Sequence, residues 1–144
     1  FYNFCKYVSE SSKDEGVVFT CDPRNVRSEK YRDAYESDKR FVYTLGTSRE
    51  MSEVASDIEM FYIDGLHDQG TVVTDVINLE NTQTNHKRPV WIFDDFDTRF
   101  GCAQEIFTLC QSSRAFKIYK VGETASGKQS HQALVLGRFV GEKS

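Results

Sequence analysis

The sequence predicts an α/β fold, with a mostly parallel sheet and an antiparallel hairpin at its C-terminal end. Short apolar runs rich in β-branched and aromatic residues alternate with segments of helical periodicity along the chain. The last two apolar runs follow each other with only a polar connection between them, which favours a hairpin. The chain has 144 residues, 39% of them hydrophobic, and we therefore assign residues 1–144 to a single domain.

The individual elements follow from periodicity and from turn residues. Apolar runs bounded by glycine, proline or charged residues predict strands over residues 16–22, 40–46, 58–65, 90–95, 115–123 and 131–139. Apolar positions at helical spacing predict helices over residues 1–8, 24–38, 47–57, 71–83 and 101–113. Thr47 or Ser48 is expected to cap the short third helix.

Charge and cysteine usage exclude several classes of protein. The chain has 18 basic and 22 acidic residues and a net charge of -4, which disfavours a nucleic-acid-binding role. It has no apolar run near the roughly 20 residues that span a bilayer, so we expect no membrane segment. None of the four cysteines forms a CxxC pair, which disfavours a structural zinc site. We expect buried free thiols and a reducing, cytoplasmic location.

Acidic residues follow three of the predicted strands. Asp22 ends the first strand, Asp64 the third, and the pair Asp94 and Asp95 the fourth. The carboxyl ends of parallel strands meet at one edge of a sheet, where ligands gather. Clustered carboxylates repel one another unless a cation is present, and oxygen ligands suit Mg²⁺. The alternative is that each acid only caps the helix that follows it.

Two further side chains near these strand ends have alternative roles. His67, three residues after Asp64, is a candidate general base or substrate contact, or else a surface histidine. Asp22 is placed to accept hydrogen bonds from a ribose diol, or else is a turn residue before Pro23.

The segments FYIDGLHDQGTVVTDV and VWIFDDFDTRFGCAQEIF resemble class I S-adenosylmethionine-dependent methyltransferases. The closest likeness is to small Mg²⁺-dependent O-methyltransferases of the macrocin type and, more distantly, the catechol type. The resemblance covers nearly the whole chain and implies a Rossmann-like methyltransferase sheet with strand order 3-2-1-4-5-7-6. The strands over residues 16–22 and 40–46 would be strands 2 and 3, those over 58–65 and 90–95 strands 4 and 5, and the hairpin strands 6 and 7.

The resemblance also implies roles for individual residues. Asp64, Asp94 and Asp95 would hold Mg²⁺, which would orient and acidify a hydroxyl of the substrate. Asp22 would bind the ribose of S-adenosylmethionine, and Ser48 would lie near its adenine. His67 and Asp64 would be the catalytic residues. The implied substrate is a hydroxylated small molecule or a sugar. Family members often pair, so the resemblance allows a homodimer, with a partner segment as the alternative, and leaves the oligomeric state open.

The chain departs from the family at its start. No strand 1 and no glycine-rich turn precede Phe1, although this strand is central in the family's sheet. We therefore expect a longer natural protein, a partner segment that supplies the strand, or a rearranged domain without catalysis. The alternative functions are a non-catalytic methyltransferase-like binding or structural module and a different nucleotide-binding α/β protein. An Asp94→Asn change is expected to weaken metal binding and to leave the fold intact.

Overall fold

The computed structural model describes residues 16–25, 36–66, 68–80, 82, 89–97, 99–112, 119–123, 129–137 and 139. The chain divides into two compact units, Phe1–Val54 and Ala55–Ser144, which we treat separately. The predicted helix over residues 1–8, and most of the one over residues 24–38, lie outside the described residues. The assignment of one domain to residues 1–144 stays a prediction.

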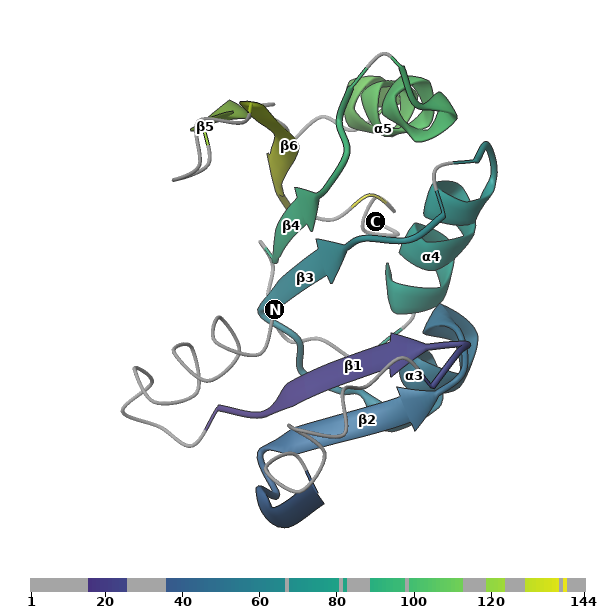
Figure 1. Ribbon diagram of the computed structural model, residues 1–144, viewed down its shortest axis with the longest axis vertical. Coiled ribbons are helices and arrows are strands. Elements are labelled where there is room, and N and C mark those ends of the chain that lie inside the picture. The colour runs from purple at the N-terminus through teal and green to yellow at the C-terminus, as the bar shows by residue number, and fades with distance from the viewer. Residues whose placement is uncertain are drawn as a thin grey trace, which may run out of the picture. The chain divides into compact units, whose positions relative to one another are not determined.

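The first unit contains a two-stranded parallel sheet (Figure 1). Strands β1 (Val18–Asp22) and β2 (Phe41–Leu45) pair in register, from Val18 opposite Phe41 to Asp22 opposite Leu45. Helix α3 (Ser48–Val54) follows β2 and contacts both strands. Thr47 Oγ1 caps the helix by accepting a 3.3 Å hydrogen bond from the Arg49 N–H, and Glu50 Oε2 accepts hydrogen bonds from the Thr47 backbone N–H at 2.7 Å and from its hydroxyl at 2.6 Å. Of the two expected caps, Thr47 is therefore the one observed.

The second unit contains a mixed four-stranded sheet. Its strands are β3 (Met60–Ile63), β4 (Val90–Phe93), β5 (Tyr119–Glu123) and β6 (Gln129–Leu136). Their order is β3-β4-β6-β5, in which β3 and β4 are parallel and β6 runs antiparallel to both of its neighbours. The predicted α/β class, with parallel strands and an antiparallel C-terminal hairpin, is therefore confirmed.

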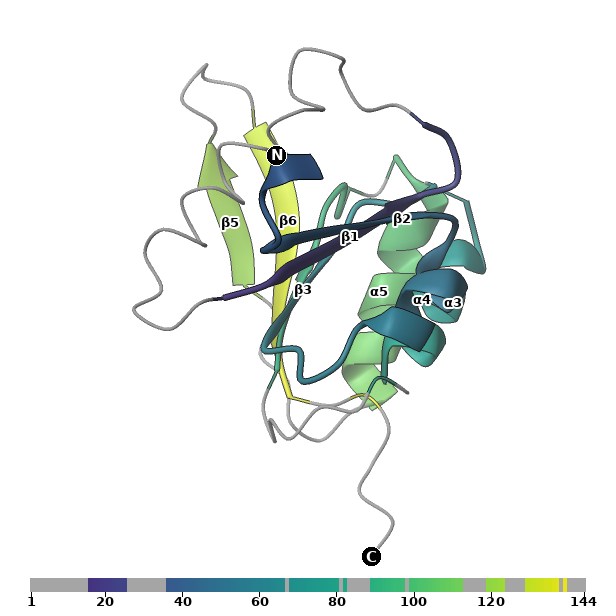
Figure 2. The same ribbon diagram turned by 90° about the horizontal axis from the view of Figure 1, so that it is seen from below.

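Helices α4 (Thr71–Glu80) and α5 (Gly101–Ser112) lie side by side in this unit (Figure 2). Neighbouring residues of a strand point to opposite faces, and the strands show this alternation. The buried strand positions are Phe61, Ile63, Trp91, Phe93, Ala133 and Val135. Val72 and Ile106 of the helices line a pocket together with Ile63 and Phe93, so the buried face is the one that α4 and α5 cover. The opposite face carries half-buried side chains such as Tyr62, Ile92 and Leu134.

Trp91 lies within β4 and is the centre of the core of the second unit. Its ring is fully buried and stacks on Phe61, with 3.9 Å between the ring centroids. The ring of Phe139 packs edge-on against it. The indole N–H donates a 3.0 Å hydrogen bond to the Gly137 carbonyl oxygen, which ties β4 to the end of β6. The aromatic packing and this hydrogen bond together hold Trp91 in one position.

Helix α4 buries one stripe of its apolar side chains. Ile77 is an apolar residue of α4, but its side chain is 53% exposed. The buried stripe runs instead through Val72, Val76 and Leu79, at the helical spacing i, i+4, i+7.

Among the described cysteines, Cys21 and Cys102 are free thiols, and only Cys102 is buried. None of the described helices has the length and apolar character needed to cross a bilayer.

Candidate functional site

The carboxyl ends of β3 and β4 bring two of the predicted acids to the same edge of the second unit's sheet. Ile63 and Phe93, the last residues of these parallel strands, are direct register partners. Asp64 and Asp94 follow them immediately, and the Asp94 N–H donates a 2.9 Å hydrogen bond to the Ile63 carbonyl oxygen. The expected convergence of these strand ends is therefore observed.

The Asp94 carboxylate is held by hydrogen bonds from both neighbouring strands. Its Oδ2 accepts a hydrogen bond from the Tyr62 hydroxyl on β3 at 2.7 Å. Its Oδ1 accepts from Gln132 Nε2 on β6 at 3.3 Å and from the Asp95 backbone N–H at 3.0 Å. Gln132 Nε2 also lies 3.3 Å from the Tyr62 hydroxyl oxygen. We call Tyr62, Asp94 and Gln132 the rim clamp.

Strand register explains why the rim clamp forms. Phe93 pairs with Ala133 on β6, so Gln132 lies opposite Asp94 one residue further along the antiparallel ladder. Tyr62 precedes Ile63 on β3 and projects to the face opposite the buried one. The clamp therefore lies on the sheet face away from α4 and α5.

Asp95 belongs to a tight turn that leaves β4. Its φ is 53°, in the left-handed region that few residues other than glycine adopt. Its carbonyl oxygen accepts a 2.7 Å hydrogen bond from the Asp97 N–H and a longer one from the Cys102 thiol, at 3.7 Å. Burial is the main reason that the pKa of this thiol is raised, and the charge of Asp95 adds to the effect. Cys102 is therefore a hydrogen-bond donor to the turn rather than a thiolate nucleophile.

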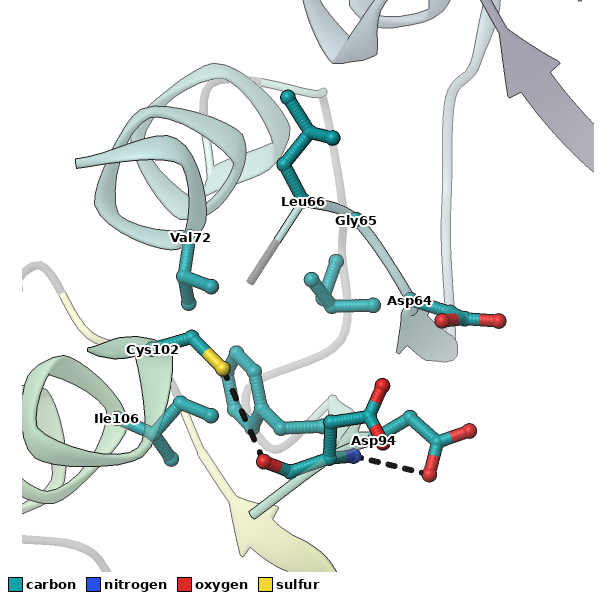
Figure 3. A pocket seen from close by; sticks show the side chains of 10 residues that line it. Asp64, Gly65, Leu66, Val72, Asp94, Cys102 and Ile106 are labelled. Atoms are coloured by element: carbon teal, nitrogen blue, oxygen red, sulfur yellow. Dashed lines mark hydrogen bonds between the residues drawn. The ribbon is translucent and has the colours of Figure 1, made fainter. Parts of the chain in front are cut away.

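A small pocket lies between the acids and the two helices (Figure 3). Val72, Cys102 and Ile106 line its apolar side, and the carboxylates of Asp64 and Asp94 lie on the opposite side of the view. The pocket thus has an apolar wall from the helices and an acidic edge from the strand ends. Asp64 is the exposed member of this edge, whereas Asp94 is half-buried.

The rim is electrostatically negative around Tyr62. Partial burial raises the pKa of the Tyr62 hydroxyl well above its usual range, and the hydrogen bond to Asp94 raises it further. The negative charges of Asp94, Asp64 and Asp95 act in the same direction. Tyr62 is therefore protonated at neutral pH and donates to the Asp94 carboxylate.

The predicted metal ligands do not form a ligand set for Mg²⁺ in this arrangement. Within the part of the chain that the structure describes, no group of three or more His, Cys, Asp and Glu side chains is placed to hold a metal ion. Both oxygens of Asp94 already accept hydrogen bonds from protein donors. The role of Mg²⁺ stays a prediction from the sequence. His67, the predicted base, lies outside the described residues.

The predicted donor-binding residues lie in the first unit, at the carboxyl ends of β1 and β2. Asp22 Oδ1 accepts a 2.7 Å hydrogen bond from the Arg24 N–H, the arrangement of an Asx turn, and the side chain is 30% exposed. The Gly46 N–H donates to the Asp22 carbonyl oxygen at 3.0 Å and joins the two strand ends. Ser48 is only 5% exposed, so little of its surface is available to a ligand. The turn role of Asp22 is observed, and its ribose role stays a prediction.

Sequence reasoning missed Tyr62 and Gln132. Tyr62 lies inside an apolar strand, where an aromatic residue is most simply part of the core. Its alternation with Phe61 and Ile63 was the available signal, since it places the hydroxyl on the other face. Gln132 had no local signal, because its position opposite Asp94 depends on how β6 pairs with β4.

No protein-family model matches the sequence, and no curated protein matches it either. The family resemblance therefore stays an expectation from the sequence. The proposed function is therefore argued from the residues at the strand ends and from their geometry.

Proposed function

We propose that the chain is an S-adenosylmethionine-dependent O-methyltransferase domain that acts on a hydroxylated small molecule or sugar. The observation that carries this proposal is the order and direction of the strands. The second unit has the order β3-β4-β6-β5, with β6 antiparallel to both neighbours. The family resemblance leads us to expect this order for strands 4-5-7-6. The parallel pair β1-β2 agrees with the expectation for strands 2 and 3.

Asp22 and Ser48, the residues proposed to bind the methyl donor, belong to the first unit. A ribose diol presents two hydrogen-bond donors, and a carboxylate at a strand's carboxyl end is suited to accept them. The partly exposed carboxylate of Asp22 fits this requirement, while its Oδ1 keeps the turn through the Arg24 N–H. Ser48, at the start of α3, is the residue proposed to lie beside the adenine.

The residues proposed to meet the acceptor belong to the second unit, where Asp64 follows the end of β3. When bound, the donor supplies an electrophilic methyl group on a sulfonium. The acceptor oxygen forms the new C–O bond while the S–C bond breaks, and the hydroxyl proton needs a base. The exposed carboxylate of Asp64 is suited to hold this hydroxyl and to receive its proton, and His67 is the second proposed base. No step is assigned to Mg²⁺, because the described carboxylates do not provide its ligand set.

One observation favours a second candidate, a methyltransferase-like binding or structural module without catalysis. The Asp94 carboxylate accepts hydrogen bonds from Tyr62 and Gln132 and so links three strands of the sheet. This role is structural, whereas the resemblance assigns Asp94 to the metal. The two candidates differ in whether the domain binds the methyl donor.

Isothermal titration with S-adenosylmethionine tests the proposal and separates it from this second candidate. The full-length protein should bind the donor, and Asp22→Asn in the same protein should bind it about tenfold more weakly, because hydrogen bonds to a charged acceptor are lost. Asparagine can still accept the Arg24 N–H, so the turn should be retained. Glu53→Gln, an exposed change on α3, is the matched control and should bind like the unchanged chain. Absence of binding by the full-length protein would reject the methyltransferase proposal in favour of the non-catalytic module.

A further inference from the structure

The rim clamp gives Asp94 a role that differs from metal ligation. The family resemblance assigns this carboxylate to Mg²⁺, but the described residues direct protein donors at both of its oxygens. The Tyr62 hydroxyl is 2.7 Å from Oδ2, and the Gln132 amide nitrogen is 3.3 Å from Oδ1. The Asp95 N–H adds a third donor to Oδ1.

We infer that Tyr62 and Gln132 are positioning residues that hold the Asp94 carboxylate between β3 and β6 and thereby keep divalent cations off it. A cation that approaches Oδ2 competes with the Tyr62 hydroxyl, which already donates a hydrogen bond to that oxygen. Replacement of a hydrogen bond to a charged group is unfavourable by enough to weaken binding about tenfold. The charge of Asp94 is thus balanced by the dipoles of two neighbouring side chains rather than by an ion.

The geometry explains why this clamp can act as a unit. Each of its three members comes from a different strand or strand end, and all lie at the carboxyl edge of β3 and β4. Gln132 also contacts the Tyr62 hydroxyl oxygen at 3.3 Å, so the two donors support each other. The inference concerns Asp94 alone and does not depend on methyl transfer.

Binding of Mn²⁺ alone, followed by electron paramagnetic resonance of the free ion, tests this inference. In the intact chain, Asp94→Asn should leave the Mn²⁺ affinity unchanged, because Asp94 is not a ligand. Tyr62→Phe should bind Mn²⁺ about tenfold more tightly, since the competing hydroxyl is removed. The double variant Tyr62→Phe/Asp94→Asn should return to the affinity of the unchanged chain, which assigns the gain to Asp94.

Tyr43→Phe is the matched control, because it removes a tyrosine hydroxyl of the first unit that donates hydrogen bonds to the backbone carbonyls of Asp22 and Arg24, and it should not change Mn²⁺ binding. Circular dichroism checks that each variant is folded, and Gln132→Met removes the second donor if Tyr62→Phe does not fold. A loss of Mn²⁺ affinity in Asp94→Asn, or no gain in folded Tyr62→Phe, would overturn the inference. Because no methyl donor is present, these outcomes are independent of the titration with S-adenosylmethionine.

Discussion

The Tyr62 hydroxyl donates a 2.7 Å hydrogen bond to Oδ2 of Asp94 and so joins β3 to the end of β4. Gln132 completes the connection from β6. The bond is charge-assisted, because a neutral phenol donates to an ionised carboxylate, and such bonds are stronger than those between neutral groups. Tyr62, Asp94 and Gln132 therefore join β3, the end of β4 and β6 at this edge of the sheet.

The raised pKa of Tyr62 predicts a loss of stability at alkaline pH. A tyrosine in the unfolded chain ionises near pH ~10, whereas burial and the neighbouring carboxylates keep Tyr62 protonated to higher pH in the folded state. The contribution of Tyr62 is therefore complete below about pH 10 and is lost as pH rises through the folded pKa. Urea unfolding at a series of alkaline pH values should show that the free energy of unfolding falls as pH rises in the intact chain. The slope of this fall should be smaller in Tyr62→Phe. Equal slopes would contradict the assignment.

Asp94→Asn is expected to destabilise the protein in metal-free buffer. An asparagine keeps one acceptor oxygen, but its amide nitrogen faces a donor, either the Tyr62 hydroxyl or the Gln132 amide. The free energy of unfolding should fall by about 1–3 kcal/mol, the usual effect of an unsatisfied polar contact. This replaces the expectation from sequence that the change leaves the fold intact. Glu53→Gln is the control, and equal stability of the two variants would restore the earlier expectation.

Trp91→Phe tests the core of the second unit. The change removes part of a fully buried ring that stacks on Phe61, and it leaves the Gly137 carbonyl oxygen without the indole donor. We expect the free energy of unfolding to fall by about 2–4 kcal/mol, from the cavity and the lost hydrogen bond together. Chemical denaturation measures it. Phe107→Leu, an exposed change on α5, should have a much smaller effect, and similar losses in both would contradict the proposed core.

The ion pair of Asp38 and Arg40 predicts acid sensitivity of the first unit. The Arg40 guanidinium donates to both carboxylate oxygens, at 2.9 and 2.6 Å, and these hydrogen bonds are the main reason that the pKa of Asp38 is lowered to about 2. Because the folded pKa is depressed, the contribution is present above the unfolded pKa of about 4 and is lost as pH falls toward the folded value. The free energy of unfolding of the intact chain should fall as the pH is lowered between these two pKa values, and it should fall less in Asp38→Asn. A pH dependence that is the same in both would argue against the ion pair.

The sequence was sufficient for the elements and for the placement of the strand-end acids. Alternating apolar runs predicted each described strand, and the rule for parallel strand ends brought Asp64 and Asp94 to one edge. What those carboxylates contact was not predictable, because Gln132 reaches Asp94 only through the pairing of β6 with β4. The exposure of Ile77 shows a related limit. Helix α4 has more apolar residues than its one buried stripe contains, and periodicity alone does not decide which of them face solvent.

Mapping of the donor site by nuclear magnetic resonance tests the central claim most directly. In the full-length protein, S-adenosylmethionine should shift the backbone amide signals of Asp22, Gly46 and Ser48, at the carboxyl ends of β1 and β2, more than those of exposed α5 residues such as Phe107. S-adenosylhomocysteine should shift the same signals. A titration in which neither compound moves these amides would contradict the assignment of a methyl-donor site to this chain.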